Sequence, residues 1–377
     1  MKILFTLGSW HPAHGGPFFS VGNLAMALSR SGHEVHLLAG DYPHMPAQAA
    51  PEGVRLHLIK GRLLPAIRQT LLPGANKCID AIIQEVQPDV IHDNGLWLTL
   101  NHKVGLAAQR HNIPHILSPR GTLDPWAMQY RNLKKRIALA LYQRRDLVSV
   151  TRFHAASLLE AKNIKAFGLT QATAVVPNGV DIPEQPARFN IDGSQTPRLA
   201  LFIGRMHPVK NLPTLLEAWA QLRPDGWHLQ LVGASEVGHR QVLESLAQKL
   251  GISKVVTFSD PVYGEAKNAL LRNAQLGFLV SKSENFGIAA AEAMAAGVPV
   301  IASRTVPWKC LQDDDLGWWV EGDVSGISAA IREACNLSPQ ELQQKGLRAR
   351  AYAQAEFGWQ SIAEKFTEQY QQMIASY

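Results

Sequence analysis

Short apolar runs of strand length alternate with amphipathic stretches along the whole sequence. The amphipathic stretches, for example 18–30, 101–110, 212–222 and 241–250, have the spacing of helices with one buried face. Strands that alternate with helices in this way predict parallel sheets covered by helices on both faces. The apolar runs predict strands at 2–7, 34–39, 54–59, 89–92, 114–117, 172–176, 199–203, 228–232, 255–258, 276–280 and 298–301.

A polar segment without periodicity separates the two halves. Residues 184–198, EQPARFNIDGSQTPR, have the composition of a linker. We therefore expect two doubly wound α/β domains, one over 1–183 and one over 184–358. The final segment, 359–377, has the pattern of one amphipathic helix, and we expect it to pack back on the first domain. Ligands of such sheets bind outside the carboxyl ends of the strands, so a cleft between the domains is the expected site.

Composition narrows the class of protein. The chain has 377 residues, of which 46% are hydrophobic and 18% are charged, as in ordinary globular proteins. Its three cysteines, Cys78, Cys310 and Cys335, are far apart and form no metal or redox motif, which favours a reducing compartment. The N-terminal apolar run is too short for a secretory signal, and no stretch approaches the ~20 apolar residues of a membrane span. We expect a cytoplasmic protein.

The most informative motif is SENFGIAAAEAMAAGVPVIAS at 283–303. Between Asn285 and Ser303 the only charged residue is Glu292, and a carboxylate in an apolar helix is costly unless it has partners. Glu284 lies eight positions earlier, just before a helix expected to begin near Gly287. Two carboxylates near a helix start suit a ligand rich in hydroxyls, and the helix start itself suits phosphate. A carboxylate that caps a loop or pairs with a core arginine is the structural alternative.

A second motif places cations directly after an apolar strand. In LFIGRMHPVKN, residues 201–211, Arg205 follows the strand and Lys210 comes five positions later. Cations at the carboxyl end of a strand point toward the ligand crevice, where an arginine fork or a lysine ammonium can hold phosphate oxygens.

A third motif is the glycine pair Gly15–Gly16, between the first strand and the first helix. A turn of this kind lets backbone amides approach a phosphate. The Gly-x-Gly-x-x-Gly spacing of a dinucleotide site is absent, which disfavours a nicotinamide-dependent dehydrogenase. The acids at 313–315 are expected in a solvated turn, and no His-Glu-x-x-His or Cys-His cluster occurs, so we expect no protein-bound metal and no cofactor.

Together these motifs resemble those of the retaining glycosyltransferases of family 4. The resemblance covers the whole chain and includes Gly15–Gly16, VVPNGVD at 175–181, GRMHPVKN at 204–211 and the spaced pair Glu284 and Glu292. It implies the GT-B fold, in which two Rossmann-like domains face each other across a cleft. Segments 118–128, 153–157, 306–308 and 316–320 are similar to a subgroup that builds bacterial surface polysaccharides, namely lipopolysaccharide, capsule or exopolysaccharide.

The resemblance also implies a role for each matching residue. Arg205 and Lys210 would hold the diphosphate of a nucleotide-sugar donor, Glu284 the transferred sugar and Glu292 the ribose hydroxyls. Gly15–Gly16 would close over the diphosphate. Further donor-binding residues would be Asn285, Phe286, Gly287 and Ile288.

Arg120 departs from the family pattern. It stands in SPRG, residues 118–121, where many relatives carry a histidine near the sugar. Arginine is always charged and cannot act as an acid or base. We interpret Arg120 as a contact to sugar or phosphate.

The expected reaction moves a hexose-type sugar from the donor to a glycan or lipid-linked glycan. Negative charge grows on the leaving diphosphate, and preorganised donors at such a position contribute roughly 10²–10³ in rate each. Arg205 and Lys210 would supply this without a metal. Retention would follow from front-face attack; double displacement would need a carboxylate nucleophile, for which Glu284 is the candidate.

Residues 131–145, RNLKKRIALALYQRR, concentrate six cations around the apolar stripe Leu133, Ile137 and Leu141. Two interpretations stay open: a solvated helix face, or a peripheral contact with anionic lipid that places the enzyme over a lipid-linked acceptor. Other functions also stay open. They are a nucleotide-sugar epimerase on the same architecture and a polyanion-binding protein, suggested by the net charge of +6. Nucleic-acid binding is disfavoured, because the cations do not alternate with aromatic residues.

Overall fold

The computed structural model describes residues 1–64, 69–129, 132–189 and 197–377. These residues form two compact units, one made of 1–179 with 359–377 and the other of 180–358. The boundary expected after residue 183 therefore lies four residues earlier in the structure. Residues 190–196 of the expected linker, and Arg131 of the basic segment, lie outside the described residues.

Unit 1 is built on a seven-stranded parallel sheet with the order β3-β2-β1-β6-β7-β8-β9. The order reverses between β1 and β6, as in doubly wound folds. A separate antiparallel hairpin consists of β4 (Arg62–Leu64) and β5 (Gln69–Leu71). The sheet strands are β1 Lys2–Leu7, β2 Glu34–Asp41, β3 Val54–Lys60, β6 Val90–Asn94, β7 His115–Ser118, β8 Arg152–Ala155 and β9 Thr173–Val175.

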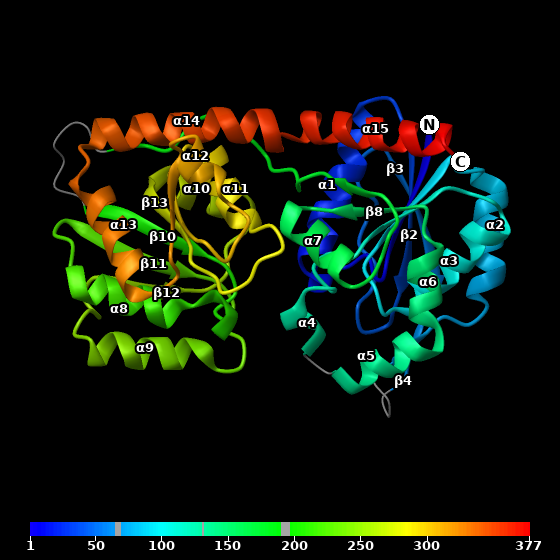
Figure 1. The fold of residues 1–377 in the computed structure, drawn as a ribbon, viewed down its shortest axis with the longest axis horizontal. Helices are drawn as coiled ribbons and strands as arrows, with labels where there is room; N and C mark the ends of the chain where they lie inside the picture. Colours follow the sequence, from blue (N-terminus) through cyan, green and yellow to red (C-terminus); the bar gives the residue numbers. More distant parts are fainter. Residues whose placement is uncertain (65–68, 130–131, 190–196) are drawn as a thin grey trace. The chain divides into compact units, whose positions relative to one another are not determined.

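Helices cover both faces of this sheet (Figure 1). One apolar layer joins the sheet to α2 and α3 through residues such as Ile79 and Val104. The other joins it to α1 and to the C-terminal α15. The helices of unit 1 are α1 Gly16–Arg30, α2 Ala75–Val86, α3 Thr99–Arg110, α4 Pro125–Gln129, α5 Asn132–Ala138, the π-helical turn η2 Leu139–Gln143, α6 Arg144–Ser149, α7 Leu158–Ala166 and α15 Trp359–Ala375, with the 3₁₀ turn η1 Pro12–His14.

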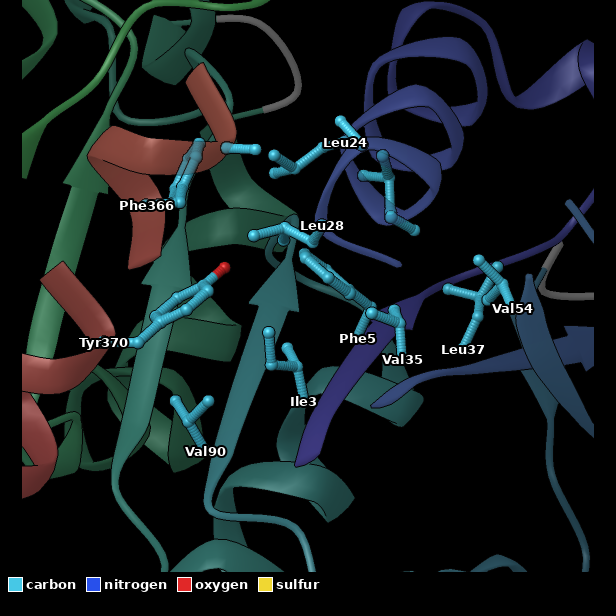
Figure 2. Close-up of a cluster of buried hydrophobic side chains, with 14 of the residues drawn as sticks. Ile3, Phe5, Leu24, Leu28, Val35, Leu37, Val54, Val90, Phe366 and Tyr370 are labelled. Atoms are coloured by element: carbon cyan, nitrogen blue, oxygen red, sulfur yellow. The ribbon is translucent and has the colours of Figure 1, made fainter. Parts of the chain in front are cut away.

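The C-terminal helix α15 is part of the unit 1 core. Figure 2 shows Phe366 and Tyr370 of α15 beside Leu28 of α1 and the strand residues Ile3 and Phe5. All five side chains are almost fully buried, and burial of each contributes roughly 1.5–3 kcal/mol. Helix α15 therefore belongs to unit 1.

Unit 2 repeats the architecture with six parallel strands in the order β12-β11-β10-β13-β14-β15. In chain order this is 3-2-1-4-5-6, the doubly wound arrangement that the alternating pattern predicts. The strands are β10 Arg198–Ile203, β11 Trp227–Val232, β12 Val256–Ser259, β13 Ala274–Leu279, β14 Val300–Ser303 and β15 Gly317–Val320. The helices are α8 Leu212–Leu222, α9 His239–Lys249, α10 Gly264–Asn273, α11 Ile288–Ala295, α12 Cys310–Asp313, α13 Val324–Asn336 and α14 Pro339–Phe357, with the turn η3 Pro208–Lys210.

Strands β8 and β15 and the β4–β5 hairpin were absent from the sequence prediction. β8 reads RFHA and β15 reads GWWV, and neither has the run of aliphatic residues that marks the other strands. Among the described residues, no helix combines the length and apolarity needed to cross a membrane. The described histidine, cysteine, aspartate and glutamate side chains form no group of three or more that could hold a metal ion.

Candidate active site

The candidate donor residues of unit 2 gather at the point where its strand order reverses. Arg205 lies two residues beyond β10 and Glu284 five residues beyond β13, and these two strands are neighbours in the sheet. Because both strands run in the same direction, their carboxyl ends open on one edge, where ligands of doubly wound sheets bind. The structure thus brings together cations and carboxylates that are about 80 positions apart in the chain.

A short turn fixes Lys210 beside Glu284. In η3 the ring of His207 accepts a hydrogen bond from the amide of Val209 at 3.2 Å. The amide of Lys282 donates to the carbonyl of Val209 at 2.8 Å, which joins this turn to the loop after β13. Lys210 Nζ and Glu284 then form an ion pair in which the side chains are only 16% and 15% exposed. Ser281 Oγ donates to the same Glu284 oxygen at 3.0 Å.

Arg205 is paired with a carboxylate that the sequence motifs did not include. Its Nη1 lies 2.8 and 3.0 Å from the two carboxylate oxygens of Glu236. Backbone hydrogen bonds between Met206 and the segment 234–236 hold the two loops together. Gly233 allows this close approach, since a Cβ there would lie 1.8 Å from the carbonyl oxygen of Gly204. Arg205 is 63% exposed, so the pair contributes little to stability and leaves the guanidinium accessible.

Glu292 lies in the second turn of α11, as expected from the sequence. The helix begins at Ile288 after Gly287, which has φ +87° and no room for a side chain because Leu279 and the Trp308 indole surround it. Glu292 Oε1 is 2.7 Å from Lys267 Nζ of α10. Glu292 therefore has a cationic partner, and this pair was also absent from the sequence prediction.

The remaining donor candidates of unit 2 differ in what their side chains face. The ring of Phe286 packs against Trp308 and Phe357, with centroids 5.4 and 5.5 Å away, and is 7% exposed. Its side chain supports the loop from within the core. Ile288, the first residue of α11, is exposed. Asn285 directly precedes Phe286 on the same loop.

In unit 1, Gly15 and Gly16 lie at the start of α1. Gly15 has φ +82°, a conformation that favours glycine, and no side chain caps the helix. A Cβ on either glycine would meet no atom within 4 Å. The backbone conformation therefore favours glycine at Gly15, and the space beside both residues is open.

Arg120 is largely buried and is held by neutral groups. Its guanidinium donates to Asn94 Oδ1 at 2.7 and 3.2 Å, to Ser20 Oγ at 3.2 Å and to Asn178 Oδ1 at 2.9 Å. Among the described residues, no carboxylate forms an ion pair with it. Burial lowers the pKa of Arg120 to about 10, with partial opposition from Glu160. Arg120 also has φ +56°, which is unusual for a residue other than glycine.

A buried polar relay lies beside Arg120, and its hydrogen-bond directions can be assigned. His154 Nε2 must donate to the carbonyl of Val176 at 2.8 Å, since a carbonyl only accepts. Burial, aided by the charge of Arg120, lowers the pKa of His154 to about 3, so the ring is neutral and its Nδ1 accepts. Ser118 Oγ therefore donates to His154 Nδ1, at 2.6 Å.

The relay extends through His92 to Tyr370 of the C-terminal helix α15. Since Ser118 uses its proton on His154, its oxygen accepts from His92 Nε2 at 2.7 Å. His92 Nδ1 then accepts from the Tyr370 hydroxyl at 2.6 Å. Burial lowers the pKa of His92 and raises that of Tyr370, which keeps both neutral. The relay ties α15 to three adjacent strands with every donor matched to an acceptor.

Comparison with known proteins identifies the family. Residues 14–184 match the family model described as Glycosyltransferase Family 4, and residues 183–353 match the one described as Glycosyl transferases group 1. The MMP alpha-(1->4)-mannosyltransferase of Mycolicibacterium hassiacum is 30% identical over 305 residues, which are 76% of this chain and 71% of that protein. This chain is a GT-B glycosyltransferase of family 4. The resemblance expected from the motifs is confirmed at the level of the family.

A second sequence relative is also a glycosyltransferase, and several solved structures share the fold. The D-inositol 3-phosphate glycosyltransferase of Geodermatophilus obscurus is 30% identical over 304 residues, 75% of this chain and 66% of that protein. Among solved structures, sucrose-phosphate synthase of Thermosynechococcus elongatus covers both chains fully with a TM-score of 0.75 and 21% identity. Anabaena HepE in complex with UDP and glucose has a TM-score of 0.72 and 19% identity, covering 99% and 100% of the chains. WaaG, involved in lipopolysaccharide biosynthesis, has a TM-score of 0.69 and 18% identity over 97% and 98%.

Sequence reasoning missed Glu236 and Lys267. Each lies at least 25 positions from its partner and has no local motif. The strand order, which makes β11 a neighbour of β10, brings the loop with Glu236 to Arg205. Lys267 reaches Glu292 because α10 and α11 border one cavity.

Proposed function

We propose that this glycosyltransferase moves a hexose-type sugar from a nucleoside diphosphate sugar to a glycan or lipid-linked glycan in the synthesis of cell-surface polysaccharide. The observation that carries the proposal is the placement of Arg205 and of the Lys210–Glu284 pair at the switch point of unit 2. That edge combines cations for a diphosphate with a carboxylate for sugar hydroxyls. HepE in complex with UDP and glucose, and WaaG with its role in lipopolysaccharide, support the donor and the pathway class.

In this proposal the two cations stabilise the leaving group without a metal ion. As the bond between the anomeric carbon and the phosphate breaks, charge grows on the diphosphate, and each fixed cation there contributes roughly 10²–10³ in rate. Glu292 binds the ribose hydroxyls, and the open start of α11, with Asn285, Gly287 and Ile288, contacts the phosphates and sugar. Phe286 contributes through its backbone, since its ring lies in the core. Gly15, Gly16 and Arg120 of unit 1 contact the donor as well.

We propose retention by front-face attack, in which a diphosphate oxygen takes the acceptor proton. Glu284 is already committed to Lys210 and Ser281, which suits a residue that orients sugar hydroxyls better than a nucleophile. The Glu284→Gln variant should lose activity without accumulating a glycosyl-enzyme adduct. Intact-protein mass spectrometry that finds such an adduct would instead support double displacement.

A transfer assay tests the proposed reaction. UDP-, GDP- and ADP-hexoses are incubated with the enzyme and a lipid-linked oligosaccharide, and the product is identified by NMR. We expect a new glycosidic bond whose anomeric configuration equals that of the donor. An incubation with donor alone separates this from the epimerase, because an altered free donor without acceptor would show epimerisation.

A phosphorylated cyclitol is a second candidate acceptor. The 30% identity to a D-inositol 3-phosphate glycosyltransferase over 75% of this chain favours it, and Arg120 supplies a cation without an acidic partner among the described residues. Inositol 3-phosphate is therefore included as an acceptor in the same assay. Product from it, and none from the lipid-linked oligosaccharide, would replace the polysaccharide assignment.

The basic segment is a candidate membrane contact. Among its described residues, Ile137 and Leu141 are exposed, as are Arg136, Arg144 and Arg145. Exposed apolar side chains flanked by arginines suit an anionic lipid surface. Leu141→Glu should reduce cosedimentation with phosphatidylglycerol vesicles at low salt, whereas Val242→Glu, at an exposed valine of unit 2, should not. Equal binding to neutral vesicles, or no binding, would leave the segment a solvated surface.

A further inference from the structure

Lys267 forms an ion pair with Glu292 that no sequence motif around Lys267 predicts. It is the fourth residue of α10, and its Nζ lies 2.7 Å from Glu292 Oε1 of α11. The two side chains are 26% and 22% exposed, so the pair is mostly removed from solvent. Glu292 is the residue that we propose binds the donor ribose, and the inference below rests on that proposal.

Lys267 and Glu292 lie on two helices that border the same cavity. Leu271 of α10 and the small residues Ala289, Ala290 and Ala293 of α11 line it. Lys267 is four residues before Leu271 and therefore lies on the same face of α10. This face borders the cavity shared with α11, and from it the lysine side chain reaches the Glu292 carboxylate.

The pair leaves one carboxylate oxygen for a ligand. Oε1 of Glu292 accepts from Lys267, while Oε2 accepts no hydrogen bond from any described residue. Ribose presents two adjacent hydroxyls, both of which donate well to a charged oxygen. A carboxylate already fixed by an ammonium group on one side loses little rotamer freedom when it binds these hydroxyls.

Lys267 also balances the charge of the site. Arg205, Lys210 and Lys267 are each paired with one carboxylate. Without Lys267 the site would carry an uncompensated, largely buried carboxylate near an incoming diphosphate, and like charges at such a distance oppose binding.

We propose that Lys267 is a positioning residue for nucleotide recognition: it fixes the Glu292 carboxylate so that the site selects a ribose with both hydroxyls. The prediction is specific to the sugar of the nucleotide. Removal of Lys267 should weaken ribonucleotide binding and reduce the discrimination against a 2′-deoxynucleotide. A purely structural ion pair between α10 and α11 would change stability without changing that discrimination.

Calorimetric titration separates these roles. The full-length wild type is titrated with UDP, GDP and ADP, and the one that binds most tightly is compared with its 2′-deoxy counterpart. The variants are Lys267→Met, Lys267→Arg, Glu292→Gln and the double variant Lys267→Met/Glu292→Gln. Lys249→Met, at an exposed lysine that ends α9, is the control for loss of one positive charge from unit 2.

We expect Lys267→Met to lose about ten- to thirtyfold in affinity for the ribonucleotide and less than about threefold for the 2′-deoxynucleotide. Lys267→Arg should recover most of the loss, and the double variant should bind as weakly as Glu292→Gln alone. Equal weakening of both nucleotides, unchanged binding, or additive losses in the double variant would overturn the role of Lys267 while the donor site stands. A wild type that binds none of the three nucleoside diphosphates would overturn the proposed function itself.

Discussion

The two units share a strand order around their switch points but hold the charges near those points differently. In unit 2, Arg205 forms an ion pair with Glu236, and Lys210 forms one with Glu284. In unit 1, the described contacts of Arg120 are all with neutral acceptors, namely Asn94, Ser20 and Asn178. One edge is built from ion pairs, and the other from a cation set in a polar network.

The difference has an energetic meaning. The Arg205–Glu236 pair is exposed, and a pair of this kind contributes about 0–1 kcal/mol, so Arg205 can exchange its partner for a ligand at small cost. A buried cation satisfied by neutral groups cannot be removed cheaply, because each orphaned acceptor costs roughly 1–3 kcal/mol. We therefore expect substitution of Arg205 to change function with little loss of stability, and substitution of Arg120 to change stability.

The largest effect is expected at Arg205. Arg205→Met removes a cation from the leaving group and should lower kcat/KM by about 10²–10³. The melting temperature should change little, because the Arg205–Glu236 pair is exposed to solvent. Steady-state kinetics and thermal denaturation of the same preparation measure both. Lys309→Met, at an exposed pair with Asp313, is the control and should be fully active. A large loss of stability in Arg205→Met would contradict the contrast between the two edges.

Arg120 tests the other side of the comparison. Arg120→Met leaves acceptors on Asn94, Asn178 and Ser20 without their donor and should lower the free energy of unfolding by about 2–4 kcal/mol. Arg120→Lys should recover only part of the loss, since an ammonium group cannot reproduce the guanidinium fork. Urea denaturation provides the measurement. Unchanged stability together with weakened donor binding would show that Arg120 serves the ligand alone.

The buried relay predicts a dependence of stability on pH. The pKa values of His92 and His154 are lowered in the folded protein, the latter to about 3. Below pH 6.5 the unfolded chain binds protons that the folded chain does not, so stability is complete above pH 6.5 and falls as the pH decreases toward 3. Between pH 7.5 and pH 5 the loss from His154 should be about 2 kcal/mol, and His92 should add to it in the same direction. Urea unfolding across this range that shows constant or rising stability would exclude neutral histidines.

Tyr370→Phe tests the contribution of one hydrogen bond of the relay, because it removes the donor to His92 while keeping the ring in the core. We expect a loss of about 1–2 kcal/mol at neutral pH. His228 lies outside the relay, and His228→Gln should leave stability nearly unchanged.

The smallest effect is expected at Glu236. Glu236→Gln removes the carboxylate that competes with a diphosphate for Arg205, so nucleoside diphosphate binding should become about two- to fivefold tighter at low salt. The gain should shrink as ionic strength rises, because the pair is exposed. Titrations at two salt concentrations check this, and weaker binding in the variant would mean that Glu236 itself helps to bind the ligand.

Much of this organisation could be predicted from the sequence because it depends on local pattern. Apolar runs such as 276–280 predict strands. Arg205 and Glu284 follow such runs, and this position predicts that they lie at the ligand edge of the sheet. β8 escaped prediction because its interior holds His154, a polar residue that is buried only since Ser118 and Val176 satisfy it. Those partners lie far away in the chain.

The partners of the site charges could not be predicted for a similar reason. Glu236 reaches Arg205 only through the strand order, and Lys267 reaches Glu292 because α10 and α11 border one cavity. Neither residue stands in a motif, and both resemble ordinary surface charges in the sequence. The sequence suggested only a ligand contact for Arg120. In the structure Arg120 also donates a hydrogen bond to Asn178 of VVPNGVD and so joins two segments of unit 1.

The central claim is that the ion-paired edge of unit 2 binds the diphosphate of a nucleotide donor. Calorimetric titration of the wild type with UDP, GDP and ADP in the presence of EDTA tests it most directly, with Arg205→Ala and Glu292→Gln titrated in parallel. The account predicts saturable binding of at least one nucleoside diphosphate to the wild type and at least about tenfold weaker binding to both variants. Binding that is equally tight in the variants, or a wild type that binds none of the three, would contradict it.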